Sequence, residues 1–230
     1  TMDNNTVGLR SHNAVIDQVF EHIDNRTTDL GHSQWHEPVE HYVSQKRYEQ
    51  EIALLRERPV VFCPSAAIPE AGSFLSRTAA GTPLLVVRDN DLRVRAFINA
   101  CRHRGMKVAS GEGCARTFSC PYHGWMYSND GVLRGVADQE KFGDFDKQTN
   151  GLTQLPVFER GGMIFTVLEP GEDEVDFDGF LGDVMDDIGR LGMENWHFCG
   201  QRKIDGANWK VAYDGYLEGY HFAAAHPDTI

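Results

Sequence analysis

The sequence predicts an α+β protein, in which a strand-rich segment lies between helical segments. Apolar residues recur at helical spacing in residues 13–23 and 43–56, so each of these segments presents one apolar face. From Val60 onwards the pattern changes to short apolar runs separated by Gly, Pro, Asn and Asp, which is typical of antiparallel strands joined by turns. After residue 170 the composition shifts and helical spacing returns. This order predicts a small antiparallel barrel or sandwich followed by a second domain that contains helices.

The individual elements can be assigned to residue ranges. The helix over 43–56 places Tyr48, Ile52 and Leu55 on one face, and Pro59 ends it. Strands are expected at the apolar runs 60–62, 84–87, 94–98, 117–119, 132–133, 155–158 and 164–168. The later elements are an exposed acidic connection over 171–178, a helix over 180–191, and a helix that begins near Asn208 and stops by Pro227. We therefore expect an N-terminal segment (1–41), a strand-rich domain (42–170) and the start of a second domain (171–230).

Composition and charge exclude several classes of function. With 230 residues, 41% of them hydrophobic, the chain can bury a core. Its formal net charge of -12 argues against a nucleic-acid surface, because phosphate binding needs clustered Lys and Arg. The stretch Thr1–Arg10 is polar, and no later stretch approaches the roughly 18 apolar residues of a membrane helix. We expect a cytoplasmic protein that binds neither nucleic acid nor membrane.

Two pairs of potential metal ligands lie in the strand-rich segment. Cys101-Arg-His103 has the spacing C-x-H, and Cys120-Pro-Tyr-His123 has the spacing C-x-x-H. Two such pairs on neighbouring loops could hold a tetrahedral zinc ion, or a two-iron, two-sulfur cluster in which two Cys bind one iron and two His the other. Zinc sites more often use C-x-x-C or H-x(3–5)-H spacing. The C-x-H gap within a strand-rich segment favours the cluster and leaves zinc as the alternative.

The longer motifs around these pairs resemble a known family. Cys101-Arg-His-Arg-Gly105 and Cys120-Pro-Tyr-His-Gly-Trp125 are similar to the two cluster loops of Rieske domains in ring-hydroxylating oxygenases. The resemblance implies a [2Fe-2S] cluster, in which one iron is held by Cys101 and Cys120 and the other by His103 and His123.

The neighbouring glycines and cysteines refine this interpretation. Gly105 and Gly124 suit loops that turn sharply and bring backbone N–H groups near the sulfurs. Respiratory Rieske proteins carry one more cysteine in each loop, paired as a disulfide, and Met106 and Tyr122 occupy the equivalent positions here. The resemblance is therefore to the lower-potential oxygenase and ferredoxin branch. The cysteines without a partner at ligand spacing, which we expect to be bystander thiols, are Cys63, Cys114 and Cys199.

A second group of potential ligands lies near residue 220, in the segment Glu218-Gly-Tyr-His221-Phe-Ala-Ala-Ala-His226-Pro227. On an ideal helix, at about 100° per residue, Asp214, Glu218 and His221 share one face, whereas His226 lies about 140° round from His221. Both histidines can bind one metal only if the helix ends or unwinds between them. Pro227 is consistent with a break just past His226. Without the upstream motif, the plainer interpretation is two unrelated histidines on an ordinary helix.

Together with that motif, the segment resembles the start of the catalytic domain in the same oxygenase alpha subunits. The resemblance is carried by Asn208-Trp-Lys210 followed by Glu-x-x-His-x(4)-His, and the combined match covers about residues 42–230. It implies an N-terminal Rieske [2Fe-2S] domain of antiparallel β strands followed by the start of a helix-grip (START-like) catalytic domain. His221 and His226 would then bind a mononuclear Fe(II), with a carboxylate completing a facial triad that leaves positions open for dioxygen and substrate.

The same resemblance makes Glu218 and Asp214 the candidate catalytic residues. In the family, an acid three residues before the first histidine bridges by hydrogen bonds from a cluster histidine of the neighbouring subunit to an iron histidine. Glu218 stands at this position, where many members have Asp. Asp214 lies one turn earlier and would support it, or be a plain solvated acid. Family subunits are longer, and their third iron ligand, an Asp, would lie beyond residue 230, with Glu218 as the alternative on spacing alone.

The function implied by the resemblance is that of a terminal oxygenase in a multicomponent system. Electrons from NADH would pass through a reductase, with or without a ferredoxin, to the cluster and then to iron, where dioxygen is used to hydroxylate a small organic substrate. Because the family's electron route crosses between subunits, we expect a head-to-tail homotrimer, with or without beta subunits. Family frequency favours an aromatic substrate. The alternatives are a Rieske mono-oxygenase or demethylase of a non-aromatic small molecule, a pure electron carrier, and a zinc-bound structural module.

Overall fold

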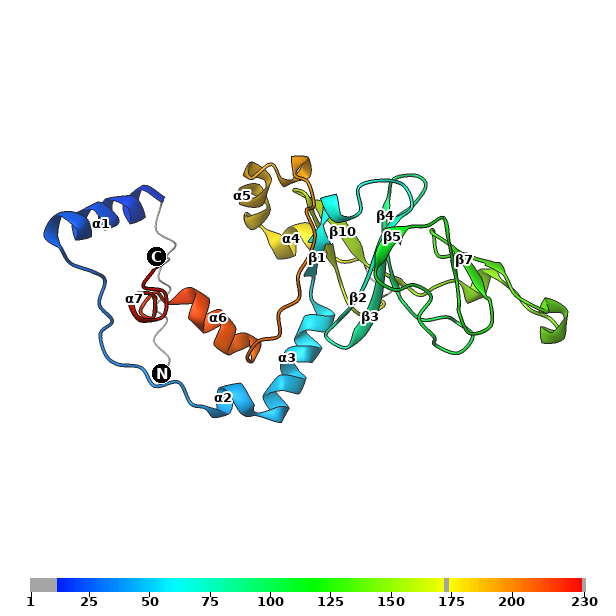
Figure 1. Ribbon diagram of the computed structural model, residues 1–230, viewed down its shortest axis with the longest axis horizontal. Coiled ribbons are helices and arrows are strands. Elements are labelled where there is room, and N and C mark those ends of the chain that lie inside the picture. The colour runs from blue at the N-terminus through cyan, green and yellow to red at the C-terminus, as the bar shows by residue number, and fades with distance from the viewer. Residues whose placement is uncertain (1–11, 172–173, 229–230) are drawn as a thin grey trace. The chain divides into compact units, whose positions relative to one another are not determined.

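The computed structural model describes residues 12–171 and 174–228 of the chain. The chain divides into two compact units, Thr1–Tyr42 and Val43–Ile230 (Figure 1). The polar stretch Thr1–Arg10 and part of the acidic connection predicted over 171–178 lie outside the described residues. Among the described helices, none is both long and apolar enough to cross a bilayer. The domain boundary near residue 170 stays a prediction.

The helices that precede the strands follow the predicted spacing. In the first unit, α1 (His12–Asn25) contains the predicted helix over 13–23. A short helix, α2 (Glu40–Val43), comes before α3 (Gln45–Glu57). The helix expected over 43–56 therefore begins at Gln45, because Ser44 leaves the helical conformation and caps α3 by accepting a hydrogen bond from the Arg47 N–H at 3.3 Å. The cap at Arg58, before Pro59, ends α3 as predicted.

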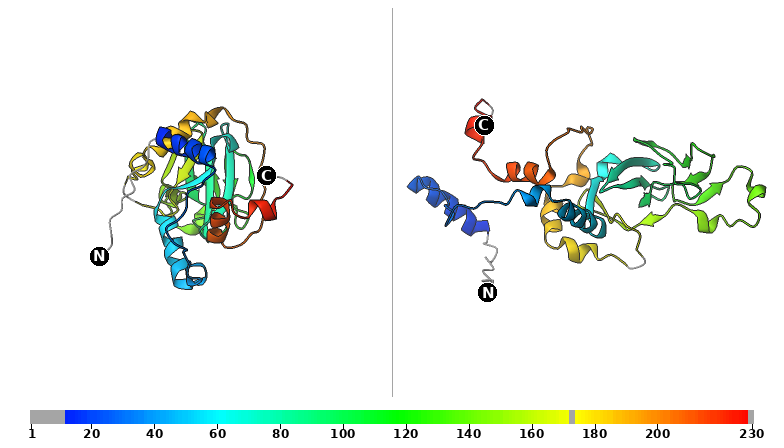
Figure 2. Two further views of the ribbon diagram at one scale, coloured as in Figure 1. Left: turned by 90° about the vertical axis from the view of Figure 1, so that its left-hand side faces the viewer. Right: turned by 90° about the horizontal axis from the view of Figure 1, so that it is seen from below.

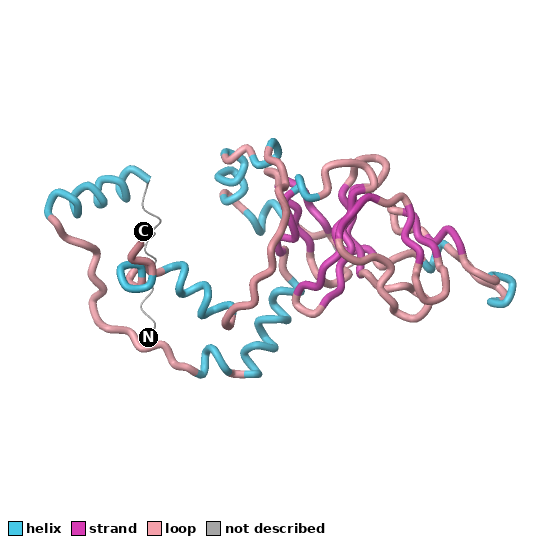
Figure 3. The backbone as a smooth tube through the Cα atoms, in the orientation of Figure 1, coloured by secondary structure: helices cyan, strands magenta, loops and turns pink. Residues whose placement is uncertain are grey.

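The strands form three antiparallel sheets within the described residues. The first sheet contains β1 (Val60–Pro64), β11 (Met163–Thr166) and β10 (Val157–Arg160) in this order. The second has the order β5 (Glu112–Cys114), β2 (Ser73–Ala79), β3 (Thr82–Arg88), β4 (Val94–Ile98), β9 (Gln154–Leu155). The third contains β6 (Thr117–Ser119), β7 (Met126–Ser128) and β8 (Leu133–Gly135). Figure 3 shows these strands confined to the part of the chain between α3 and the next α-helix, so the predicted antiparallel β domain is confirmed.

Strand β3 is the centre of the core because both of its faces are covered. Its run Leu84-Leu85-Val86-Val87 is fully buried. Leu84 and Val86 pack into one hydrophobic cluster with residues of β1 and β11, whereas Leu85 and Val87 pack into a second cluster with residues near β6 and β7. Successive strand residues point to opposite faces, so a continuous apolar run is the pattern expected of a strand covered on both sides. Figure 2 shows the same strands packed together from two further directions.

Some strands and breaks differ from the prediction for local reasons. The strands β2, β5 and β7 lack the pure apolar runs that were used to place the others, and β2 reads Ser-Phe-Leu-Ser-Arg-Thr-Ala. The strand expected over 155–158 is divided at Pro156, which cannot donate a ladder hydrogen bond. The hairpin between β2 and β3 turns at Ala80 and Gly81, both with positive φ (45° and 80°), as a tight two-residue hairpin turn requires.

The remaining helices come after the strands. The helix expected over 180–191 is divided into α4 (Phe177–Leu181) and α5 (Val184–Arg190), because Gly182 takes a positive φ of 51° between them. Phe177 and Met185 of these helices pack on Phe165 of β11 in a third hydrophobic cluster. The last two helices are α6 (Trp209–Leu217) and α7 (Phe222–Ala225). The single-turn 3-10 helices are η1 (Ser65–Ala67), η2 (Gln139–Phe142), η3 (Gln148–Asn150) and η4 (Met193–Asn195).

Candidate metal centres

The two Cys–His pairs lie on loops with the same backbone pattern. In each loop the cysteine N–H donates to the carbonyl five residues later, at 2.8 Å, and the glycine N–H four residues later donates to the cysteine carbonyl, at 2.8 or 2.9 Å. The bonded pairs are Cys101–Met106, Cys101–Gly105, Cys120–Trp125 and Cys120–Gly124. Both glycines have positive φ, 74° and 70°, where a Cβ would strain the backbone. The expectation that the glycines serve sharp loop turns is confirmed.

The structure brings the four predicted cluster ligands together. The Cys101 and Cys120 side chains are buried, each residue being 3% exposed. The rings of His103 and His123 lie with their centroids 4.6 Å apart, at an interplanar angle of 66°. His103 also stacks on the Trp125 ring at 5.0 Å and 9°. Two buried sulfurs and two facing imidazoles are the donor set that a Rieske-type [2Fe-2S] cluster takes.

One nitrogen in this group carries the clearest sign of a metal ligand. Among the described residues, the Nδ1 atom of His103 is buried and has no hydrogen-bond partner. Buried polar atoms are nearly always hydrogen-bonded, so an exception needs an explanation. Burial, and then the neighbouring His123 and Arg104 charges, lower the pKa of His103, which favours the neutral imidazole that binds metals. The residues therefore fit a [2Fe-2S] cluster.

No three His, Cys, Asp or Glu side chains in the described part of the chain converge on a point where one ion could sit. In a Rieske-type [2Fe-2S] cluster each iron takes only two protein ligands, so the site needs one Cys pair and one His pair rather than three side chains around one ion.

Tyr127 and Asn99 are buried polar residues that could not be identified from the sequence, and they form hydrogen bonds with the first loop. The Tyr127 hydroxyl lies 3.3 Å from the Cys101 sulfur and accepts a hydrogen bond from the Arg102 N–H at 3.0 Å. Burial, and then the contact with Cys101, raise the pKa of Tyr127, so its hydroxyl stays protonated. Asn99, which is fully buried, accepts hydrogen bonds from the N–H groups of Val108 and Ala109 at 2.9 and 3.3 Å. These bonds hold the first loop at both of its ends.

The second group of ligands lies where a helix is interrupted, as its spacing requires. Asn208 caps the start of α6 by accepting a hydrogen bond from the Lys210 N–H at 2.9 Å. The helix ends at Leu217, with Glu218 as its C-terminal cap. His221 then begins the short helix α7, and His226 ends it. The helix α7 between the two histidines ends at Ala225, just before His226, as predicted, and a further break that was not predicted separates α6 from α7 before His221.

The break brings both histidines and Glu218 together. The imidazole centroids of His221 and His226 are 5.4 Å apart. The Nδ1 of His221 lies 2.6 Å from Oε1 of Glu218, whose other oxygen accepts a hydrogen bond from the Tyr220 N–H at 2.7 Å. The hydrogen bond with His221 holds the pKa of Glu218 below its usual range, which keeps the carboxylate ionised. A metal-binding histidine commonly gives its second nitrogen to a carboxylate in this way, so Nε2 is left to face a metal.

Asp214 lies one helical turn before Glu218, in α6. Its backbone carbonyl accepts a hydrogen bond from the Glu218 N–H at 3.2 Å, within the last turn of α6. Its side chain is exposed. The supporting role suggested for this side chain stays a prediction.

The three cysteines expected to be bystanders differ in burial. All five cysteines carry free thiols. Cys63 is buried on β1, and burial raises its pKa to about 12, whereas Cys114 and Cys199 are exposed. Cys114 lies on β5 and Cys199 lies in the segment before α6, so neither belongs to one of the two groups of ligands.

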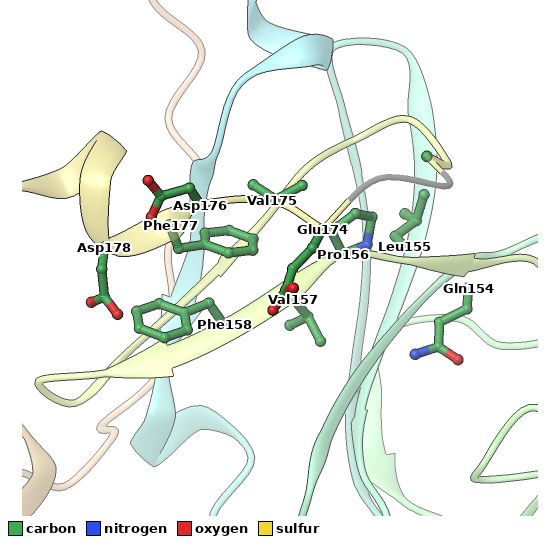
Figure 4. A pocket seen from close by; sticks show the side chains of 11 residues that line it. Gln154, Leu155, Pro156, Val157, Phe158, Glu174, Val175, Asp176, Phe177 and Asp178 are labelled. Carbon is green, nitrogen blue, oxygen red and sulfur yellow. The ribbon is translucent and has the colours of Figure 1, made fainter.

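A cavity of about 810 Å³ lies between β9, β10 and the start of α4 (Figure 4). Phe158 and Phe177 stack there with their centroids 5.2 Å apart. Two of its acids have structural partners, since Asp176 caps α4 by accepting from the Gly179 N–H at 2.8 Å and Asp178 pairs with Arg160. None of the predicted metal ligands lines this cavity.

These loops and this fold define a protein with a Rieske iron–sulfur domain. Residues 58–158 match the family model of the Rieske [2Fe-2S] domain, and residues 193–230 match that of the ring hydroxylating alpha subunit (catalytic domain). The chain belongs to the alpha subunits of Rieske non-haem iron oxygenases, as its motifs predicted. The family's cofactors are a [2Fe-2S] cluster and a mononuclear non-haem iron, which confirms both predicted cofactors.

Relatives of known activity are similar to most of this chain. The carnitine monooxygenase oxygenase subunit of Escherichia coli (strain K12) is 30% identical over 202 residues, which cover 84% of this chain and 52% of the relative. The glycine betaine monooxygenase oxygenase subunit of Pseudomonas aeruginosa (strain UCBPP-PA14) is 32% identical over 210 residues, 89% of this chain and 48% of the relative. The solved structure of the quaternary ammonium Rieske monooxygenase CntA with L-carnitine aligns with a TM-score of 0.76 and 26% identity, over 85% of this chain and 57% of that chain. The chain spans about half the length of the curated relatives it matches.

Proposed function

We propose that the whole protein is the terminal oxygenase component of a multicomponent Rieske oxygenase. The observation that carries this proposal is the geometry around His221, where Glu218 occupies Nδ1 at 2.6 Å and a second imidazole, His226, lies 5.4 Å away. An electron carrier needs only the cluster residues. A carboxylate-oriented histidine pair downstream of those residues supports a second, oxygen-activating iron.

The ligand assignment follows from the two groups of side chains. Cys101 and Cys120 would hold one iron of the cluster, and His103 and His123 the other. His221 and His226 would hold the mononuclear iron. When bound, the cluster supplies single electrons and the mononuclear iron supplies a site for dioxygen beside the substrate.

The chain's own residues position these groups. Tyr127 and Asn99 hold the first cluster loop through hydrogen bonds at both of its ends. Glu218 fixes the orientation of the His221 ring and holds its Nδ1 proton, so that Nε2 faces the iron position. Because the carboxylate is engaged with His221 and with the Tyr220 N–H, Glu218 is better suited to orienting this ring than to being the third iron ligand.

The relatives support a quaternary ammonium substrate for the whole protein. Two of them act on carnitine and glycine betaine, and the aligned structure is a quaternary ammonium monooxygenase. This favours the non-aromatic mono-oxygenase or demethylase, which the sequence analysis held as an alternative, over the aromatic substrate expected from family frequency. Oxidation of such a substrate at a carbon next to nitrogen would use one dioxygen, two electrons and two protons, and would release water.

The expected partners follow from the same chemistry. Electrons from NADH would reach the cluster through a reductase, with or without a ferredoxin. A homotrimer, with or without beta subunits, would allow the cluster of one subunit to serve the iron of the next.

Turnover of the whole protein tests this proposal. Purified protein with a compatible reductase, NADH and dioxygen is assayed against glycine betaine, L-carnitine and an aromatic acid, and dioxygen uptake is compared with product formed. We expect coupled oxidation of a trimethylammonium substrate, and loss of coupling in His226→Ala with the cluster spectrum retained. Coupled oxidation of the aromatic acid alone would overturn the substrate class. Absence of the second iron in reconstituted protein would overturn the oxygenase assignment.

A further inference from the structure

An ion pair joins the start of α6 to α3. The Lys210 ammonium donates to Oε1 of Glu51 at 2.7 Å, although the two residues are 159 positions apart. Their side chains are only 19% and 22% exposed. The Lys210 ammonium also lies 6.0 Å from the centre of the Trp209 ring. Among the described residues of α6 none is buried.

The pair differs from the ordinary surface ion pairs of this chain. Arg190 and Asp187, for example, are three residues apart on one helix and have side chains 74% and 64% exposed. Exposed pairs of that kind contribute little to stability. The hydrogen bond from Lys210 holds the pKa of Glu51 below its usual range.

The C-terminal end of α3 contacts the Rieske domain, and the C-terminal end of α6 carries the second group of ligands. At the C-terminal end of α3, the Arg56 guanidinium donates to the Ala80 carbonyl at 2.8 Å, and the Arg56 carbonyl accepts from the Leu168 N–H at 3.1 Å. These bonds tie α3 to the β2–β3 hairpin and to the end of the Rieske domain. At the C-terminal end of α6 lie Glu218 and His221. A continuous series of contacts therefore runs from the Rieske domain through Glu51 to the iron ligands.

We propose that Glu51 is a positioning residue, which sets the place of the His221 and Glu218 segment relative to the Rieske domain of the same chain. The inference rests on the proposed function: in the proposed trimer each iron takes electrons from the cluster of the next subunit, so a shift of this segment against its own Rieske domain also shifts its iron relative to that cluster. Nine residues of α6 make a rigid rod about 14 Å long, so a tilt of about 10° at a freed start displaces its far end by about 2 Å. A misplacement of only about 1 Å in a reacting centre can cost about a hundredfold in rate.

Substitution of Glu51 in the whole protein tests this role. Glu51→Gln keeps the shape of the side chain and removes its charge. The matched control is Glu49→Gln on the same helix, since Glu49 is exposed and accepts a local hydrogen bond from Gln45 at 3.0 Å. The third variant exchanges the charges, Glu51→Lys with Lys210→Glu. Each protein is compared in cluster content, in the reduction potential of the cluster, and in the rate at which dioxygen and substrate reoxidise the reduced cluster.

The expected result is a selective loss that the exchanged pair repairs. Glu51→Gln should reoxidise its cluster about tenfold more slowly, with cluster content and potential unchanged, and the exchanged pair should recover to within about threefold of the natural protein. Equal rates in the Glu51→Gln and Glu49→Gln proteins would overturn the inference, as would an exchanged pair no faster than Glu51→Gln. A natural protein without a mononuclear iron would instead refute the proposed function, independently of Glu51.

Discussion

The hydroxyl of Tyr127 is expected to raise the reduction potential of the cluster, and Tyr127→Phe removes that hydroxyl alone. Its oxygen accepts from the Arg102 N–H at 3.0 Å, and a cluster-bound Cys101 has no proton to give, so the hydroxyl must donate to the sulfur 3.3 Å away. Hydrogen bonds to charged groups contribute about 1.5–3 kcal/mol. The reduced cluster carries one more negative charge than the oxidised cluster, so this hydrogen bond stabilises the reduced state more than the oxidised state, by about 1 kcal/mol. For a one-electron couple this corresponds to about 40 mV.

The assay is a redox titration of the cluster, followed by electron paramagnetic resonance. Tyr127→Phe should lower the midpoint by about 40 mV, because reduction loses a stabilising donor. Tyr48→Phe is the matched control, since Tyr48 is exposed on α3. An unchanged or raised midpoint in Tyr127→Phe, with cluster content intact, would refute the reasoning.

Three further predictions concern other parts of the molecule. Replacing His221 by Ala should remove the mononuclear iron and leave the cluster's resonance signal unchanged, as measured by iron content and spectroscopy. Replacing Glu159 by Gln should cost about 1–3 kcal/mol at pH 7, because Arg88 then loses its carboxylate at a site where the two side chains are 10% and 31% exposed. Burial raises the pKa of Glu159, but the hydrogen bonds from Arg88 outweigh it and the net change is downward. This stabilisation is therefore present above about pH 5 and is lost as the pH falls through the folded pKa. Denaturant unfolding at several pH values should show the two proteins converging in acid. A maleimide at pH 7 should label the exposed Cys114 and spare Cys63 in the native protein, as peptide mass spectrometry would show.

The cluster loops could be predicted from sequence because their chemistry is local. Each loop places its ligands and its turning glycine within five residues, so the spacing itself specifies the geometry. The same holds for β3, whose four consecutive apolar residues require cover on both faces. The end of the helix between His221 and His226 could also be inferred, because a regular helix cannot direct both histidines to one ion, whereas the break before His221 was not predicted.

The residues that support the loops could not be predicted, because their partners are distant in the sequence. Tyr127 reaches back 26 positions to the Cys101 sulfur, and Glu51 reaches 159 positions to Lys210. Such contacts depend on tertiary packing, which local spacing does not encode. Strand β2 was missed for a related reason. Polar residues such as Ser73 and Ser76 interrupt its pattern of apolar residues, and only the folded structure shows that their hydroxyl groups take part in hydrogen bonds with residues outside the strand.

The most direct test of the account is the metal content of the whole protein, purified without oxygen and reconstituted with ferrous iron. The account predicts about three irons and two acid-labile sulfides per chain, with a Rieske-type resonance signal in the reduced protein. It also predicts that His221→Ala lowers the iron to about two without changing the sulfide. Two irons and two sulfides in the natural protein, with no further uptake of iron, would contradict the second metal centre.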